Sequence, residues 1–270
     1  MASFHFLVGQ NVRILSLNVN GFRSAVKHGL WDLIVEQCID VACFQEIKGT
    51  LDPSQHSEYI LSEFVGAISP ISNQFGVGTM ADQSIQLLTT NLEKQQNAFR
   101  GRLIGGQLEN GVEMWNVYAP TIMANEIEDA CIPFWKTLLE CSERWVEKPC
   151  IICGDFNLIG SPLDIHPSLL KSRKKTIETQ YYLYNQLLAQ GWIDCWRQCH
   201  SDSRRYTYWS KQPKHLRTDN RGLRLDYVLC SPSLQSSIVK ANIIEVDSKI
   251  SDHASVVVEF NFPNSNEALH

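Results

Sequence analysis

Polar side chains that can bind a metal ion or move a proton stand at the ends of the apolar segments of this 270-residue chain. A single acid or amide in such a place is ordinarily a turn cap, but here six apolar runs each have an Asn, Glu, Tyr, Asp or His at their boundary. The residues at these six boundaries are Asn18 with Asn20, Glu46, Tyr118, Asp155 with Asn157, Asp226, and Asp252 with His253. This recurrence predicts a catalytic site built from strand ends and their loops.

Three of these residues suit a hard divalent cation. Glu46, Asn18 and Asp252 offer the oxygen ligands that Mg²⁺ or Mn²⁺ prefers, and no cluster of Cys and His competes for a softer metal. The sequence contains no serine nucleophile elbow, phosphate-binding glycine loop or dinucleotide fingerprint. Metal-assisted hydrolysis of a phosphoester is the chemistry that remains.

The other boundary residues could handle protons. His253 follows an acid, and a further Asp could hold its ring, which would fix one tautomer and stabilise an imidazolium ion. Asp155 and Asn157 lie two residues apart beyond one strand, so both can face the same side and orient an attacking water molecule.

Short β-rich runs alternate with helical ones along the chain. We expect strands at residues 12–17, 40–45, 76–81, 102–108, 113–118, 150–154, 225–230, 241–246 and 254–260, and helices at about residues 27–37, 125–146 and 176–190. We find no internal repeat, low-complexity tract or linker that would divide the chain. The prediction is one α/β domain, residues 1–270 with a core at about 12–260, in which helices cover sheets.

Charge is distributed unevenly. The chain carries 24 Lys and Arg against 29 acids, a net charge of −5. The stretch from Lys171 to Arg224, however, contains twelve Lys and Arg and only four acids, so it carries a charge of +8 and the remainder of the chain −13. A run of charge is often only a solvated face, but such asymmetry also fits a protein that grips a polyanion on one side.

Composition excludes several other classes. With 44% hydrophobic and 20% charged residues the chain is neither disordered, collagen-like nor a coiled coil. No apolar run reaches the roughly 18 residues that a membrane helix needs, and the first residues do not form an export signal.

Several of the nine cysteines fall in strand-like runs, so we expect free buried thiols. We therefore expect an intracellular, non-membrane protein that is a monomer.

The boundary motifs, taken together, match a known family. They are Leu17-Asn18-Val19-Asn20-Gly21, Phe44-Gln45-Glu46-Ile47-Lys48, Asn116-Val117-Tyr118-Ala119-Pro120, Gly154-Asp155-Phe156-Asn157, Asn220-Arg221-Gly222-Leu223-Arg224-Leu225-Asp226-Tyr227 and Ser251-Asp252-His253. In this order they resemble the exonuclease III type of AP endonuclease, of the endonuclease–exonuclease–phosphatase superfamily. The resemblance implies a two-sheet, four-layer α/β sandwich and Mg²⁺-dependent cleavage of double-stranded DNA 5′ to an abasic site, leaving a 3′-hydroxyl.

The resemblance also implies residue roles. Glu46 would bind the metal ion, with Asn18, Asp252 and Asp155 close to it. Asp155 would activate or position water together with Asn157. His253, paired with Asp226, would stabilise the pentacoordinate phosphate, and Tyr118 would donate to the phosphate or lie beside the leaving group. Substrate contacts would come from Asn20, Arg221, Arg224, Trp209 and Leu225, and the segment Tyr206-Thr207-Tyr208-Trp209 would line the abasic-sugar pocket, with core packing as the alternative.

Some motifs depart from the family pattern. Ala119-Pro120-Thr121 has Thr where the family usually has Asn, Ala254-Ser255 follows the Asp-His pair in place of a residue and Pro, and residues 174–180 lack a Pro-Glu-Glu-Arg-like element. These changes leave the cleavage chemistry intact and put the abasic-site preference in question. Whether 3′-exonuclease or 3′-phosphodiesterase activity is present stays open.

Other functions share parts of this pattern. A retrotransposon-type endonuclease that nicks target DNA often has Tyr-Ala-Pro and Gly-Asp-Phe-Asn, but lacks the run from Asn220 to Asp226. Relatives that hydrolyse inositol phosphates, sphingomyelin or poly(A) match less well around Asn18 and Glu46. A catalytically dead DNA-binding module would ordinarily have lost a metal carboxylate or the histidine, and this chain has both.

Overall fold

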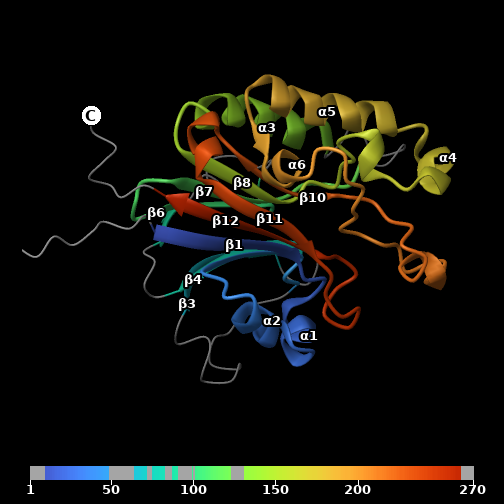
Figure 1. The fold of residues 1–270 in the computed structure, drawn as a ribbon, viewed down its shortest axis with the longest axis horizontal. Helices are drawn as coiled ribbons and strands as arrows, with labels where there is room; N and C mark the ends of the chain where they lie inside the picture. Colours follow the sequence, from blue (N-terminus) through green and yellow to red (C-terminus); the bar gives the residue numbers. More distant parts are fainter. Residues whose placement is uncertain are drawn as a thin grey trace, which may run out of the picture.

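Two β-sheets pack face to face and helices cover their outer faces, which gives four layers (Figure 1). The computed structural model describes residues 10–48, 64–71, 75–82, 87–90, 99, 101–122 and 131–262. The arrangement is the two-sheet α/β sandwich that the resemblance implies.

The first sheet has the strand order β11-β12-β1-β2-β4-β3 within the described residues. Neighbouring strands run antiparallel except β1 and β2, which are parallel. The strands are β1 (Gln10–Asn18), β2 (Val41–Gln45), β3 (Phe64–Ile71), β4 (Phe75–Asp82), β11 (Ile238–Ile244) and β12 (Ser255–Phe262).

The second sheet has the order β5-β6-β7-β8-β10-β9 over the same described ranges. Here β7 and β8 form the parallel pair, and the other neighbours are antiparallel. The strands are β5 (Leu87–Thr90), β6 (Leu103–Leu108), β7 (Glu113–Tyr118), β8 (Cys150–Asp155), β9 (Ile193–Asp194) and β10 (Asp226–Cys230).

Alternation of side chains along the strands builds the layers. Along β8, Ile151 and Cys153 enter the core between the two sheets, whereas Cys150 and Ile152 enter the core beneath the helices of the second sheet. Because both faces of β8 are covered, the whole strand is apolar up to the point where Gly154 and Asp155 end it.

Helices lie on both outer faces. The short helices α1 (Phe22–Lys27) and α2 (Leu30–Glu36) cover the first sheet, and α3 (Ile132–Trp145) and α5 (Ile177–Ala189) cover the second (Figure 1). Two smaller helices, α4 (Leu170–Arg173) and α6 (Cys195–Cys199), flank α5 in sequence. No helix within the described ranges is both long and apolar enough to cross a membrane.

All nine predicted strands are present, with ends displaced by a few residues, and β3, β5 and β9 were not predicted. The single helix expected at 27–37 was wrong, because Gly29 takes a φ of +105° and divides this region into α1 and α2. The helix expected at 125–146 begins at Ile132, and residues 125–130 lie outside the described part. All nine cysteines are free thiols, as expected; seven are buried as predicted, whereas Cys38 and Cys199 are exposed.

Strand registers bring the polar strand ends together. Asn18 pairs with Gln45 at the ends of β1 and β2, and Tyr118 pairs with Asp155 at the ends of β7 and β8. Asp155 also lies opposite Asp226, the first residue of antiparallel β10. The parallel strands therefore finish at one edge, and the site forms there.

Candidate active site

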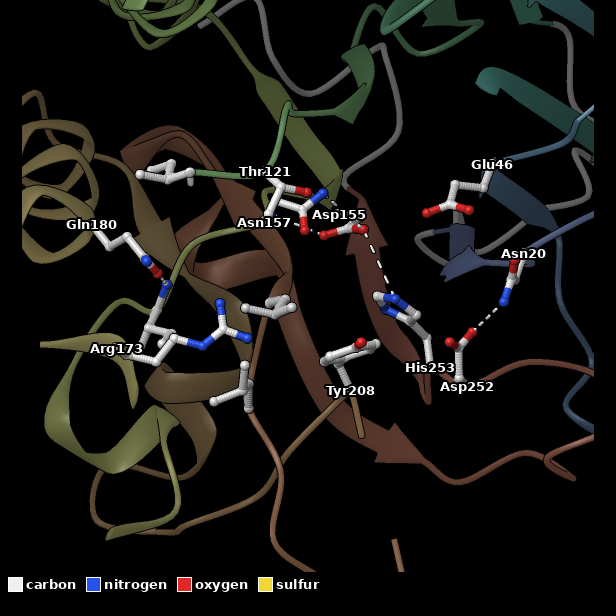
Figure 2. Close-up of a pocket in the computed structure, with 14 residues that line it drawn as sticks. Asn20, Glu46, Thr121, Asp155, Asn157, Arg173, Gln180, Tyr208, Asp252 and His253 are labelled. Carbon is white, nitrogen blue, oxygen red and sulfur yellow. Dashed lines mark hydrogen bonds and ion pairs between the residues drawn. The ribbon is translucent and has the colours of Figure 1, made fainter. Parts of the chain in front are cut away.

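A polar cavity of about 260 Å³ opens at this edge of the two sheets. Figure 2 shows Glu46, Asn20 and Asp252 at one end, Arg173 and Gln180 at the other, and Asp155, Tyr208 and His253 between them. Its remaining lining residues are Thr121, Ile122, Asn157, Ile159, Leu223 and Leu225. The cavity therefore combines carboxylates, amides, an imidazole and a guanidinium group.

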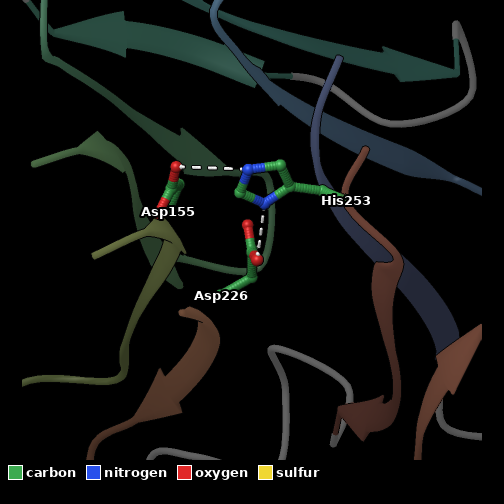
Figure 3. Close-up of side chains that lie close together, drawn as sticks. All are labelled: Asp155, Asp226 and His253. Carbon is green, nitrogen blue, oxygen red and sulfur yellow. Dashed lines mark hydrogen bonds and ion pairs between the residues drawn. The ribbon is translucent and has the colours of Figure 1, made fainter. Parts of the chain in front are cut away.

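Three buried side chains form the centre of the site (Figure 3). Nδ1 of His253 lies 2.9 Å from Oδ2 of Asp226, and its Nε2 lies 4.0 Å from Oδ2 of Asp155. The ring of Tyr208 packs 4.9 Å from the imidazole, centroid to centroid. The histidine is thus held by one carboxylate while its other nitrogen faces a second.

Burial and charge set the protonation of these groups. Burial disfavours the charged imidazole, but the adjacent Asp226 carboxylate outweighs it and raises the pKa of His253 to about 9. For Asp155, burial and the nearby negative charge of Asp226 raise the pKa to about 7. At neutral pH the imidazole is therefore cationic, and Asp155 is poised to gain or lose a proton.

Asp155 is fixed by the turn that follows β8. The backbone N–H of Asn157 donates to its Oδ1 at 2.9 Å, and the Asn157 side chain donates to the Ala119 carbonyl at 2.9 Å. Asn157 has a φ of +49°, which an asparagine tolerates. Gly154 is required before it, because a Cβ there would lie 1.9 Å from the carbonyl oxygen of Val117.

A second cluster contains Glu46. Nδ2 of Asn18 donates to Oε1 of Glu46 at 3.1 Å and to Oδ2 of Asp155 at 2.8 Å, so both carboxylates converge on one amide. The hydroxyl of Tyr118 donates to the same Glu46 oxygen at 2.9 Å, and Nζ of Lys48 lies 2.7 Å from the other. Burial opposes ionisation of Glu46, but these hydrogen bonds outweigh it and lower its pKa.

Asp252 lines the same cavity as Glu46. Nδ2 of Asn20 donates to its Oδ1 at 2.7 Å, and Lys211 lies 3.5 Å from its other oxygen. Burial again opposes ionisation, but His253 and the Asn20 hydrogen bond outweigh it and lower the pKa of Asp252. Asp252 and Glu46 are therefore both anionic at neutral pH.

The donor set fits a hard divalent cation. Glu46, Asp155 and Asp252 supply carboxylate oxygen atoms, and no thiolate is among the described lining residues. Asn18, which the sequence predicted as a ligand, does not offer its oxygen there, because its amide nitrogen faces Glu46 and Asp155 and its oxygen accepts from the Asn20 N–H. Asp226 also has a buried Oδ1 with no hydrogen-bond partner among the residues that the structure describes. Asp155, Asp226 and His253 lie close enough to share a metal ion, and Nδ1 of the imidazole is already hydrogen-bonded to Asp226.

The structure brings most of the predicted site residues together. Asn18, Asn20, Glu46, Asp155, Asn157, Asp226, Asp252 and His253 form one connected network, Tyr118 joins it through Glu46, and Leu225 lines the cavity. Arg221 lies farther away, on a second cavity, with its Nε bonded to Oγ of Ser168 at 2.9 Å.

Two expected substrate contacts were wrong. Arg224 is 1% exposed, and its guanidinium bonds to Asp164 and Asp194 at 2.7 and 2.6 Å, so it cannot reach DNA. Trp209 is also buried, in the core between the sheets, with the guanidinium of Arg217 5.0 Å from its ring. Alternation within the aromatic segment explains this second error: Tyr208 lines the cavity, so its neighbour points inward.

Several lining residues were not assigned from the sequence. Arg173 and Gln180 come from the region between β8 and β10 that carries no recognised motif, and Thr121 stands at a departure from the family pattern. Lys48 was noted only as part of its motif, although its ammonium group contacts Glu46. The cluster of basic residues in the sequence was the one signal that could have pointed to Arg173.

The chain resembles known nucleases. The model of the Endonuclease/Exonuclease/phosphatase family matches residues 15–253. The exodeoxyribonuclease of Bacillus subtilis is 25% identical, over 93% of this chain and 100% of the relative. The DNA-(apurinic or apyrimidinic site) endonuclease of Dictyostelium discoideum is 26% identical, over 93% and 71%. Recombination repair protein 1 of Drosophila melanogaster is also 26% identical, but this chain spans only 37% of its length.

Solved structures share the fold. An AP endonuclease from Archaeoglobus fulgidus superposes with a TM-score of 0.77 at 22% identity, covering 93% of this chain and 99% of its own. The AP endonuclease LMAP from Leishmania major gives a TM-score of 0.79 at 19% identity, covering 94% of this chain and 89% of its own.

Proposed function

The chain belongs to the endonuclease/exonuclease/phosphatase family, and we propose that it is a Mg²⁺-dependent DNA-repair phosphodiesterase that cleaves the backbone 5′ to abasic sites. The observation that carries this proposal is the convergence of Glu46, Asp155 and His253, from distant parts of the chain, on one cavity, with Asp226 bonded to the imidazole of His253. The nuclease names of the relatives support DNA as the substrate.

Glu46 and Asp155 would hold the metal ion, with the Asn18 amide between them and Asp252 beside them. When bound, Mg²⁺ would supply positive charge to the phosphate and the leaving 3′ oxygen. Mn²⁺ has the same preference for oxygen ligands and could substitute. The hydroxyl of Tyr118 would keep Glu46 oriented, and its ring would lie beside the leaving group.

Asp155 and His253 would handle the proton and the developing charge. Asp155, whose pKa is raised to about 7, would accept a proton from the attacking water while the Asn157 N–H holds the carboxylate in place. The imidazolium of His253, fixed by Asp226, would donate to a phosphate oxygen as the pentacoordinate phosphate forms. Each donor of this kind contributes roughly 10² to 10³ in rate.

The substrate would be double-stranded DNA. Asn20 and Leu225 line the cavity that would hold the abasic sugar and its phosphate, and Arg221 stands nearby to contact the backbone. We propose one catalytic domain acting as a monomer inside the cell. A target-nicking endonuclease of retrotransposon type would use the same chemistry and differ in the DNA that it selects.

Incubation of the purified protein with three substrates would test this proposal. They are a duplex with one abasic site, the same duplex without it, and an inositol polyphosphate, each with Mg²⁺ or with EDTA. We expect cleavage of the abasic duplex alone, only with Mg²⁺, leaving a 3′ end that a DNA polymerase can extend. Equal nicking of both duplexes would favour the target-nicking alternative, and turnover of the inositol polyphosphate alone would reject a nuclease.

A further inference from the structure

A second cavity of about 330 Å³ adjoins the catalytic one, and the two share Arg173, Tyr208 and Leu223. Its wall contains apolar side chains from three segments, among them Leu169, Leu216 and Pro213, with Arg221 at its edge. The catalytic cavity is mostly polar, whereas this one is mostly apolar. The two therefore suit different parts of one ligand.

Tyr208 and Leu223 lie between the two cavities and are held together by backbone hydrogen bonds. Tyr208 and Leu223 exchange backbone hydrogen bonds of 2.8 and 2.9 Å, and Tyr208 also pairs with His253. A chain that occupies both cavities must pass over these two residues. Its apolar part would then lie against Leu223 and the Tyr208 ring on the far side from the catalytic imidazole.

Arg173 lines both cavities, together with Tyr208 and Leu223, and its positive charge is not paired with an acid of the described residues. Among the described residues its guanidinium group has no hydrogen bond or ion pair, although its backbone carbonyl accepts from Thr176, and the side chain lies at the end of the catalytic cavity away from Glu46 (Figure 2). Neighbouring arginines are occupied: Arg224 and Arg197 bind Asp164. A guanidinium that lines two cavities and has no partner in the described part of the chain is suited to a phosphate group.

We propose that the second cavity binds an unpaired nucleobase of the substrate strand, and that Arg173 binds the phosphate joining that nucleotide to the one in the catalytic cavity. This inference rests on the proposed function and adds a base-binding subsite to it. An aromatic and aliphatic wall suits the face of a base, and a cavity of this volume holds one nucleoside but no base pair. The strand must therefore be unpaired at this position, as at a frayed or mismatched end.

Binding without metal tests the subsite separately from catalysis. The probes are the 5′-phosphorylated thymidine dinucleotide and the same molecule with one base replaced by hydrogen, titrated by calorimetry in EDTA at low salt. We expect the full dinucleotide to bind about ten-fold more tightly than the better of its two abasic counterparts. Equal affinities, or no measurable binding of the dinucleotide, would overturn the proposal.

Two variants locate the binding. Ser172→Phe fills the second cavity, which Ser172 lines, and should abolish the preference for the full dinucleotide while the abasic probes bind as before. Arg173→Gln should weaken all probes about ten-fold, whereas Lys174→Gln, which removes the same charge from a residue that lines neither cavity, should change them less than two-fold. Equal effects of Arg173→Gln and Lys174→Gln, or an unchanged preference in Ser172→Phe, would overturn the assignment. Failure to cleave abasic DNA would reject the proposed function and leave these affinities measurable.

Discussion

The side-chain amide of Gln45 in β2 donates a hydrogen bond of 2.8 Å to Oδ1 of Asn116 in β7, across the interface between the two sheets. Both residues are buried, and Nδ2 of Asn116 donates in turn to two backbone carbonyls of the first sheet. Gln45 precedes Glu46, and Asn116 lies two residues before Tyr118, the residue that bonds to Glu46. This polar link therefore holds the ends of the two strands at a fixed distance from each other.

Replacing Asn116 by Leu should destabilise the protein. The change removes the acceptor of the 2.8 Å bond from Gln45, whose amide keeps only longer bonds to Ser16 and Cys43, and it removes a donor to the carbonyls of Phe44 and Gly78. Loss of buried hydrogen bonds of this kind costs about 1–3 kcal/mol. Urea denaturation should show a lower midpoint, with a smaller loss of cleavage rate as Glu46 and Tyr118 lose alignment. Gln107→Leu on the adjacent strand β6, where one bond to Gly111 is lost, is the matched control. An Asn116→Leu protein as stable as this control would mean that the link contributes nothing.

Glu46→Gln should weaken metal binding. The amide keeps the size of the side chain and removes the charge, so the affinity for Mn²⁺, measured by titration calorimetry, should fall more than about ten-fold. The cleavage rate should fall by about 10² to 10³, because charge stabilisation at the phosphate is lost. Glu259→Gln, on the exposed side of β12, controls for the loss of a carboxylate. Unchanged Mn²⁺ affinity would remove Glu46 from the metal site.

Asp155→Asn should abolish turnover and leave DNA binding intact. The asparagine cannot accept a proton from water, but it preserves the shape of the turn that Asn157 closes. Single-turnover cleavage and a gel-shift titration, carried out on the same preparation, separate the two effects. An equivalent exchange at the exposed Asp202 should change neither. Undiminished cleavage by Asp155→Asn would assign the base to another residue.

Activity should depend on pH as a bell between the pKa values of Asp155 and His253, about 7 and about 9. The rate rises as Asp155 loses its proton and falls as His253 loses its own. Asp226→Asn removes a negative charge that raises both pKa values, so both limbs of the kcat/KM profile should move to lower pH. An alkaline limb that stays near 9 in this variant would show that Asp226 does not hold the imidazolium.

Arg224 and Arg221 should behave oppositely although only three positions separate them. Arg224→Met leaves Asp194 buried without an ion-pair partner and Asp164 with Arg197 alone, and should cost about 3–5 kcal/mol of stability. Arg221→Gln should leave stability nearly unchanged and reduce by about one the slope of log affinity for DNA against log salt. The two measurements are urea denaturation and binding at several salt concentrations. A salt slope identical to that of the parent chain would mean that Arg221 faces away from DNA.

Local sequence patterns were enough to predict nine strands and most of the site residues. Asp155, Glu46 and His253 each end or precede an apolar run, and such runs with their boundary residues are visible without knowledge of distant contacts. The strands β3, β5 and β9 escaped prediction because their patterns are weak or very short; β9 has only two residues and forms by pairing with β10.

Tertiary structure decided what charge and aromaticity alone could not. Arg224 looks like a DNA contact in a basic stretch, yet two acids from other segments, Asp164 and Asp194, neutralise it inside the protein. Likewise, the sequence indicates the aromatic segment, but only the packing of the folded chain places Tyr208 in the wall of the cavity and Trp209 in the core. The sequence by itself determined which groups carry the chemistry, because their types follow from local pattern. The burial and the pairing of each charge depend on residues far away in the chain, so the tertiary structure alone decided which of them can reach a substrate.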